Sequence, residues 1–252
     1  MSITNEQYVS EYLKRLDYHG NTIPCVETLL ALHQAHMYHV PFENLDLLGD
    51  SFSPKLDRDF LFDKIVCRKR GGVCYEMNTS FYYLLTAMGF HAQQISGAVQ
   101  PGENMFSHVA TLVHFDDCAY IADVGFGDSY LPPVKVGTEI THVNGINYFM
   151  DFMDAETADI MRQFPGKDPE RMYTIALVPR KISDYFERFQ WASAKGNTIF
   201  SQRPICVSHT PERRATLRKG ILSIEVAGQI VESRPIEPGA ETEQCLREYF
   251  GL

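Results

Sequence analysis

The chain has 252 residues, of which 44% are hydrophobic and 22% are charged, so it is long enough to bury a sizeable globular core. Its formal net charge of −9 argues against nucleic acid as a partner, because phosphate binding needs a clustered basic face and the one compact basic run is Arg68-Lys69-Arg70. No stretch reaches the roughly 18 apolar residues that a membrane helix needs, and the first residues do not resemble a secretory leader, so we expect a cytoplasmic protein without a membrane partner.

The first third of the chain has the pattern of helices. Thr4 and Gln7 predict a capping box ahead of a first helix. The segment Pro41-Phe42-Glu43-Asn44-Leu45 is predicted to be a loop, because proline disfavours a helical conformation in the residue before it. Apolar residues at helical spacing predict further helices over residues 26–37, 58–66 and 74–88.

After Gly89, which ends the last of these helices, the pattern changes to the period-two alternation of strands. Helices, then antiparallel strands, then a mixed segment predict an α+β fold. We expect strands over residues 91–99, 107–115, 119–124, 148–153, 173–179, 205–208, 221–226 and 229–232, and a final helix over 241–249.

The six cysteines are scattered and include no C-x-x-C pair, so we expect reduced thiols that form neither a disulfide framework nor a metal site. Cys74 is different, because it follows Arg70-Gly71-Gly72-Val73 and opens a predicted helix. The two glycines allow a tight turn and close approach of a ligand to the backbone. A helix N-terminus offers unpaired N–H groups and a partial positive charge, which favour a thiolate. The alternative interpretation of Cys74 is a buried core residue.

His108 and Asp123 each lie in an apolar predicted strand. A lone histidine in such a strand is more often a core residue than a base, but a buried carboxylate must find a partner. If residues 116–117 form a hairpin turn, His108 faces Gly125, and Asp123 is a diagonal neighbour on the same face, roughly 7–8 Å away at Cα. Asp123 then points at His108, and Cys74 would complete an activated-thiol triad.

These residues lie in four motifs that resemble those of the arylamine N-acetyltransferases and occur in that family's order. The motifs are Pro41-Phe42-Glu43-Asn44-Leu45, Arg70-Gly71-Gly72-Val73-Cys74-Tyr75-Glu76-Met77-Asn78, His108 with its apolar strand, and Asp123-Val124-Gly125-Phe126-Gly127. The resemblance covers nearly the whole chain. It implies an α+β fold with a cysteine-protease-like core, made of an N-terminal helical bundle (residues 1–88), a central antiparallel β-barrel (89–185) and a C-terminal α/β lid (186–252).

The resemblance also implies the chemistry. Cys74 is expected to be the nucleophile, His108 its base and Asp123 the partner that orients the base. In the implied ping-pong reaction Cys74 takes the acetyl group of acetyl-CoA and passes it to an arylamine, an arylhydroxylamine or a hydrazine, without a metal. An oxyanion hole is required, and the backbone N–H of Cys74 is the candidate donor.

Several other motif residues carry expectations of their own. Arg70 and Glu43 are expected to form a structural salt bridge. Glu76 and Asn78, as early helix residues, are expected to pair locally. Expected walls of the acceptor pocket are Phe42, Phe126 and the lid residue Phe200, with plain core packing as the alternative for the first two. CoA is expected to contact Asn104, Ser107, Trp191, Asn197 and Thr198, although Ile199 stands where a small hydroxyl residue is common in the family.

Three rival functions fit parts of the same pattern. An amide synthase of the same fold would keep the triad and use an acyl donor other than CoA. A papain-like or transglutaminase-like thiol hydrolase would share the Cys–His–Asp order. A binding or scaffold protein would hold the three residues as core, although no interaction helix or long charge run favours it.

Overall fold

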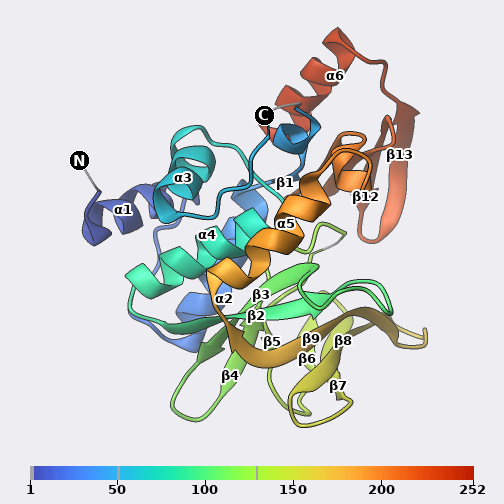
Figure 1. Cartoon of the computed structure of the whole chain (residues 1–252). Coiled ribbons are helices and arrows are strands. Elements are labelled where there is room, and N and C mark those ends of the chain that lie inside the picture. Colours follow the sequence, from blue (N-terminus) through green and yellow to red (C-terminus); the bar gives the residue numbers. More distant parts are fainter. Residues whose placement is uncertain (1–2, 50–51, 129) are drawn as a thin grey trace.

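The computed structural model describes residues 3–49, 52–128 and 130–252, and the chain passes from helices through a curved sheet to a mixed segment (Figure 1). The predicted capping box begins the first helix: Gln7 N donates to Thr4 Oγ1 and Thr4 N donates to Gln7 Oε1, both at 3.2 Å. The helical part consists of α1 (Asn5–Arg15), α2 (Val26–His39), a short 3-10 turn η1 (Leu45–Leu48), α3 (Arg58–Leu61), a π-helical turn η2 (Phe62–Cys67) and α4 (Cys74–Ala87).

Helix α4 lies between α1 and α3 on one side and the sheet on the other (Figure 1). Residues Tyr75–Phe81 of α4 are all buried, because α1 and α3 cover one side of the helix and strands β2 (His91–Ala98) and β3 (His108–His114) cover the other. A helix buried on most of its faces shows little amphipathic periodicity, and α4 accordingly contains few charged residues. This burial fixes the residue at its first turn, Cys74, inside the molecule.

The helix predicted over residues 58–66 is divided in the structure. Regular α-helix ends at Leu61, and in η2 the backbone hydrogen bonds join residues five positions apart instead of four, as in the 2.8 Å bond from Arg68 N to Asp63 O. Arg70 N then donates to Lys64 O at 3.0 Å, which turns the chain toward the glycines. The wider turn directs the Lys64 side chain into the interior, where it is fully buried.

Eight antiparallel strands form the second part, in the order β5-β4-β3-β2-β9-β8-β7-β6. Since β5 contacts β7, the sheet curls into a nearly closed barrel (Figure 1). Strand β8 was not predicted, because only Ala158 and Ile160 face the core and most of the other positions are polar. The strands are β2 (His91–Ala98), β3 (His108–His114), β4 (Ala119–Ala122), β5 (Val134–Lys135), β6 (Thr141–Val143), β7 (Ile146–Phe152), β8 (Thr157–Gln163) and β9 (Glu170–Arg180).

The last part of the chain contains a helix and most of a second, five-stranded sheet. Its elements are η3 (Ile182–Tyr185), α5 (Phe186–Ser193), η4 (Ile199–Ser201), β10 (Ile205–His209), β11 (Arg214–Arg218), β12 (Ile221–Val226), β13 (Gln229–Pro235), α6 (Ala240–Cys245) and η5 (Leu246–Phe250). The sheet order is β1-β10-β11-β12-β13, and β1 (Phe42–Glu43) comes from the helical part. The loop prediction for residues 41–45 was therefore wrong at three positions: Phe42 pairs with Val207, Glu43 pairs with Cys206, and Leu45 begins η1.

These findings confirm the predicted α+β fold of N-terminal helices, central barrel and C-terminal mixed segment. Among the described residues, no helix is both long and apolar enough to cross a membrane.

Candidate active site

Cys74 is the first residue of α4 and is half-buried. Its Sγ lies 3.9 Å from the carbonyl oxygen of Ser107, which directly precedes His108. Within the described chain, no His, Cys, Asp or Glu cluster of three or more is placed to hold a metal ion.

The glycines before Cys74 serve a purpose other than the one expected. A Cβ added at Gly71 would lie 1.7 Å from the carbonyl oxygen of Pro41, so it is the protein's own backbone, not a ligand, that approaches here. Glu43 N donates to Gly72 O at 3.0 Å, and the predicted salt bridge is confirmed, with Arg70 Nη2 2.8 Å from Glu43 Oε1. The motif at residues 41–45 and the motif at residues 70–78 are thus held side by side.

The hairpin between β3 and β4 has the predicted turn and register. Phe115 N donates to Cys118 O at 2.8 Å across residues 116–117, and Thr111 pairs with Ala122. Just beyond the last pair, His108 Nε2 lies 2.6 Å from Asp123 Oδ2. A carboxylate only accepts, so Nε2 carries the proton and Nδ1 is left as the nitrogen available to a thiol.

Asp123 is fully buried, and both oxygens of its carboxylate contact hydrogen-bond donors. Its Oδ1 accepts from Asn78 Nδ2 at 2.8 Å and from Gly125 N at 2.9 Å, while Oδ2 faces His108. His33 Nε2 lies 3.0 Å from the backbone oxygen of Asp123. The carboxylate and its backbone are therefore held from both the helical part and the barrel.

The prediction that Asn78 pairs locally was wrong. Its Nδ2 also donates to Val109 O at 2.7 Å, and its Oδ1 accepts from Val124 N at 2.9 Å, so Asn78 joins α4 to both strands of the hairpin. The signal for this role is its spacing, because a residue four positions after Cys74 lies on the same face of the helix. Glu76 does cap the helix locally, accepting from Val73 N at 3.1 Å, but it also binds Lys64.

The electrostatics of the pair favour an imidazolium. Burial lowers the pKa of His108, but the Asp123 charge, the hydrogen bond to Asp123 and the interaction with Cys74 outweigh it and raise this pKa from 6.5 to about 10. Burial raises the pKa of Asp123, and His108, Asn78 and Gly125 together lower it below its ordinary value. The imidazole of His108 is therefore a favourable acceptor for a proton that leaves the Cys74 thiol.

A third neighbour of the pair was missed from the sequence. Tyr173 on β9 is fully buried, and its ring centroid lies 4.8 Å from that of His108 and 5.3 Å from that of Phe126. Burial and the nearby Asp123 carboxylate raise the pKa of Tyr173. The strand itself was predicted, but which of its residues faces the site depends on how the barrel closes.

The three phenylalanines approach the site from different parts of the chain. The ring centroid of Phe126 lies 6.0 Å from that of His108 in an edge-on geometry. The ring centroids of Phe42 and Phe200 lie 6.0 Å apart, and both residues belong to the same apolar cluster as Cys74. Their role as walls of an acceptor pocket stays a prediction.

The residues expected to contact CoA are placed differently from one another. Asn197 Nδ2 donates to Trp191 O at 3.0 Å and Thr198 Oγ1 donates to Ala192 O at 2.7 Å, so both side chains cap α5. Trp191 is 45% exposed and carries the Arg188 guanidinium 3.9 Å above its ring. Asn104 Oδ1 accepts from Phe106 N at 2.8 Å, which shapes the turn before Ser107.

A cavity of about 740 Å³ lies over the C-terminal sheet and reaches Gly127, close in sequence to Phe126. Its lining combines apolar residues, among them Ile205, Val207 and Ile221, with four cations. These are Arg203, Arg214, Arg218 and Lys219, accompanied by Asp128 and Glu225. None of the five residues expected to bind CoA lines this cavity.

A half-buried thiol beside an imidazole that a carboxylate orients defines the class of enzymes that form acyl-thioester intermediates. Comparison with known proteins narrows this class. The sequence model of an N-acetyltransferase family matches residues 25–252. The chain is 28% identical over 251 residues to the arylamine N-acetyltransferase of Escherichia coli, covering 97% of this chain and 88% of that one. It is 28% identical over 230 residues to human arylamine N-acetyltransferase 1, covering 81% and 78%.

Solved structures agree with these matches. The arylamine N-acetyltransferase of Salmonella typhimurium superposes with a TM-score of 0.90 at 27% identity, covering 100% of this chain and 92% of that one. The Mycobacterium marinum enzyme in complex with CoA gives a TM-score of 0.87 at 26% identity, covering 96% and 92%. The chain belongs to the arylamine N-acetyltransferase family and is an acyltransferase.

Proposed function

We propose that this protein works in the cytoplasm and acetylates arylamines, arylhydroxylamines or hydrazines with acetyl-CoA, through an acetyl-thioester on Cys74. The observation that carries the proposal is the 2.6 Å contact between His108 and Asp123 beside that thiol, in a chain of this family. A weakly basic aromatic amine needs an activated acyl donor, and a thioester is one. Exchange of one thioester for another is nearly isoenergetic, so the equilibrium of the first half-reaction favours neither acetyl-CoA nor acetyl-Cys74 strongly.

Each half-reaction uses the same three side chains. His108 accepts the thiol proton and Asp123 stabilises the resulting imidazolium, while the Cys74 thiolate attacks the thioester carbonyl and CoA leaves with the returned proton. The acceptor amine then attacks the acetyl-Cys74 carbonyl, His108 takes the amine proton, and the thiolate leaves. The Cys74 N–H, at the first position of α4, is our candidate oxyanion donor, because the first N–H groups of a helix have no partner within it.

We propose that the cavity over the C-terminal sheet holds the nucleotide portion of CoA. Cations suit the phosphates of CoA, and the cavity reaches Gly127, where an added Cβ would lie 2.7 Å from the Phe42 ring. Arg218→Gln is expected to raise the KM for acetyl-CoA several-fold and leave the KM for the acceptor unchanged. Arg247→Gln, an exposed arginine on the last helix, is the matched control. An unchanged KM for acetyl-CoA would move CoA back to the Trp191 and Asn197 side.

The test of the main proposal is acetylation without an acceptor. Incubation with acetyl-CoA is expected to add one acetyl mass, which peptide mass spectrometry assigns to Cys74, and adding an arylamine is expected to remove it. Cys74→Ala should abolish labelling, whereas Cys67→Ala, which removes an exposed thiol, should not. If the reduced wild-type protein is never labelled, acetyl-CoA is not the donor and the amide synthase becomes the better reading. Peptide cleavage without any acyl acceptor would instead indicate a hydrolase.

A further inference from the structure

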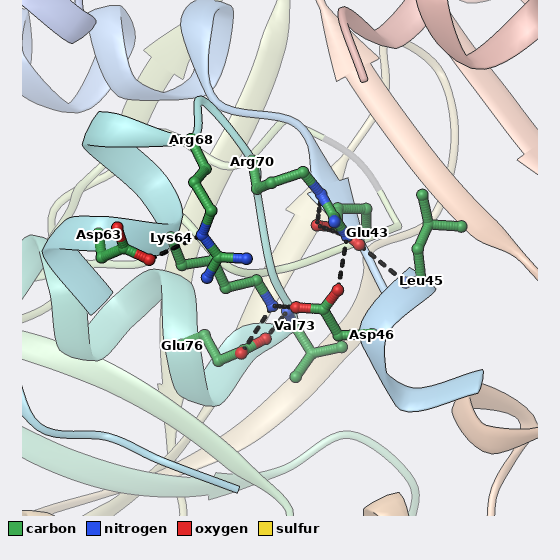
Figure 2. A network of polar contacts seen from close by, with 9 residues as sticks. All are labelled: Glu43, Leu45, Asp46, Asp63, Lys64, Arg68, Arg70, Val73 and Glu76. Carbon is green, nitrogen blue, oxygen red and sulfur yellow. Dashed lines mark hydrogen bonds and ion pairs between the residues drawn. The ribbon is translucent and has the colours of Figure 1, made fainter. Parts of the chain in front are cut away.

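Five side chains form a continuous chain of ion pairs beside the nucleophile helix (Figure 2). Lys64 Nζ lies 2.7 Å from Glu76 Oε1 and 3.0 Å from Asp46 Oδ2. Arg70 Nη2 lies 3.0 Å from Asp46 Oδ1 and 2.8 Å from Glu43 Oε1. Asp46 therefore gives one oxygen to each cation and is the link between two pairs that would otherwise be separate.

The chain of ion pairs is buried at its centre. The side chains of Glu43, Lys64 and Glu76 are 0% exposed, and those of Asp46 and Arg70 are about one quarter exposed. A charge in the interior is stable only with well-placed partners, so each of these groups fixes the position of the next. Burial lowers the pKa of Lys64, but Glu76, Glu43 and Asp46 more than reverse this, so the ammonium stays charged.

One end of the chain of ion pairs is attached to the nucleophile. While Glu76 Oε1 binds Lys64, Glu76 Oε2 accepts from the N–H of Val73, the residue directly before Cys74. Burial raises the pKa of Glu76, and Lys64 opposes this rise, so without Lys64 the carboxylate would tend toward its neutral form. The first turn of α4 thus depends on a cation that η2 supplies.

The other end is attached to the segment that carries an expected wall of the acceptor pocket. Glu43 Oε2 accepts from Leu45 N at 2.7 Å, and Glu43 directly follows Phe42. Asp46 lies in η1, the turn that follows this segment. Because π-helical turns often occur at functional positions, the wider turn that brings in Lys64 is consistent with a role in the site.

We propose that Lys64, acting through Asp46 and Glu76, is a positioning residue that fixes the Cys74 turn of α4 relative to the Phe42 segment. The inference rests on the proposed role of Cys74 as nucleophile. Lys64 touches neither reactant. It acts by keeping the thiol at the imidazole and the pocket wall at the thiol, where a misplacement of about 1 Å can cost on the order of 100-fold in rate.

The decisive variant is Asp46→Ala, because it cuts the link while Lys64 keeps Glu76 and Arg70 keeps Glu43. We expect iodoacetamide to alkylate Cys74 about tenfold more slowly in this variant at pH 7, measured peptide by peptide so that the other thiols do not interfere. When the alkylation rate is measured against pH, the midpoint of its acidic limb should shift to a higher pH in this variant. The kcat for acetyl transfer should fall by a larger factor than either KM value changes. Asp46→Asn keeps one acceptor oxygen and should lie between the wild type and Asp46→Ala.

Lys64→Met is expected to show the same changes to a greater extent, and Lys14→Met, an exposed lysine paired with Glu11, should show none. Circular dichroism and urea unfolding establish that each variant is folded, and Asp46→Ala decides alone if Lys64→Met is not. A folded Asp46→Ala protein with wild-type alkylation rate, pH profile and kcat overturns the inference. Alkylation needs no acetyl-CoA, so normal alkylation of Cys74 without any acetylation counts against the proposed function and leaves this inference standing.

Discussion

Replacing Asp123 by asparagine tests the triad most directly, because it changes one atom of a fully buried group. In the wild type, Oδ1 accepts from Asn78 and Gly125 and Oδ2 accepts from His108. Asparagine has one acceptor oxygen, which the Asn78 amide and the Gly125 N–H will retain, so its NH₂ group takes the place of Oδ2. Two donors cannot face each other, and His108 must therefore change to the tautomer protonated on Nδ1. The nitrogen nearest the thiol is then a donor and no longer a base.

The expected loss of rate can be derived from the contact between His108 and Asp123. A rise in the pKa of His108 from 6.5 to about 10 corresponds to about 5 kcal/mol in favour of the imidazolium, since one pKa unit is about 1.36 kcal/mol. Some of this energy will be recovered as the buried site relaxes. We therefore expect about a 10³-fold loss in the rate of Cys74 acetylation at pH 7, somewhat less than the roughly 10⁴-fold loss in kcat known for the equivalent substitution in a Ser-His-Asp triad.

The assay is rapid-quench mass spectrometry of the acetyl-Cys74 peptide, with iodoacetamide alkylation of the same peptide as a second readout of the thiolate. Asp116→Asn, at the exposed turn of the same hairpin, is the matched control and should react at the wild-type rate. Near-ultraviolet circular dichroism shows whether the aromatic surroundings are intact. A folded Asp123→Asn protein whose acetylation and alkylation rates stay within threefold of wild type would refute the reasoning.

Three further outcomes are expected. Gly125→Ala places a Cβ 2.8 Å from Cys74 Cα, so it should lower the free energy of unfolding by about 1–3 kcal/mol in urea titrations and slow acetylation of Cys74. Wild-type values for both would show that the packing around Gly125 is not tight. The stabilisation that His108 gains from its carboxylate partner is complete below pH 6.5 and is lost as the pH rises through about 10. The gap in unfolding free energy between wild type and His108→Gln should therefore shrink by about 4 kcal/mol from pH 6 to pH 10, and a gap that does not change with pH contradicts the raised pKa. Asn44→Leu removes a buried amide that bonds three backbone groups of the C-terminal part, at Phe200, Arg203 and Ile205, at 2.7–2.8 Å. It should lower the free energy of unfolding by about 2–4 kcal/mol in the same titration and raise the KM for acetyl-CoA, whereas a loss below about 0.5 kcal/mol would show that other contacts hold this part in place.

Local sequence determined the elements that carry the reacting groups. Cys74 opens a helix that is rich in apolar residues, and the two glycines before it separate this helix from the preceding helical segment, which ends at Cys67. His108 and Asp123 meet because a two-residue turn sets the register of a short hairpin, and register decides which side chains share a face. All of these signals act over a few residues to a few turns, so they can be found in the sequence alone.

The supports of the site were decided only by the tertiary fold. Asn78 reaches Asp123 across 45 positions in sequence, Lys64 enters the interior through a π-helical turn, and Phe42 pairs with a strand more than 160 residues later. No local pattern marks these contacts, since each depends on how helices and sheets dock after they form. The sequence could therefore indicate which groups react, but the burial that sets their charges, and the ion pairs that hold them in place, exist only when the three parts of the chain are packed together.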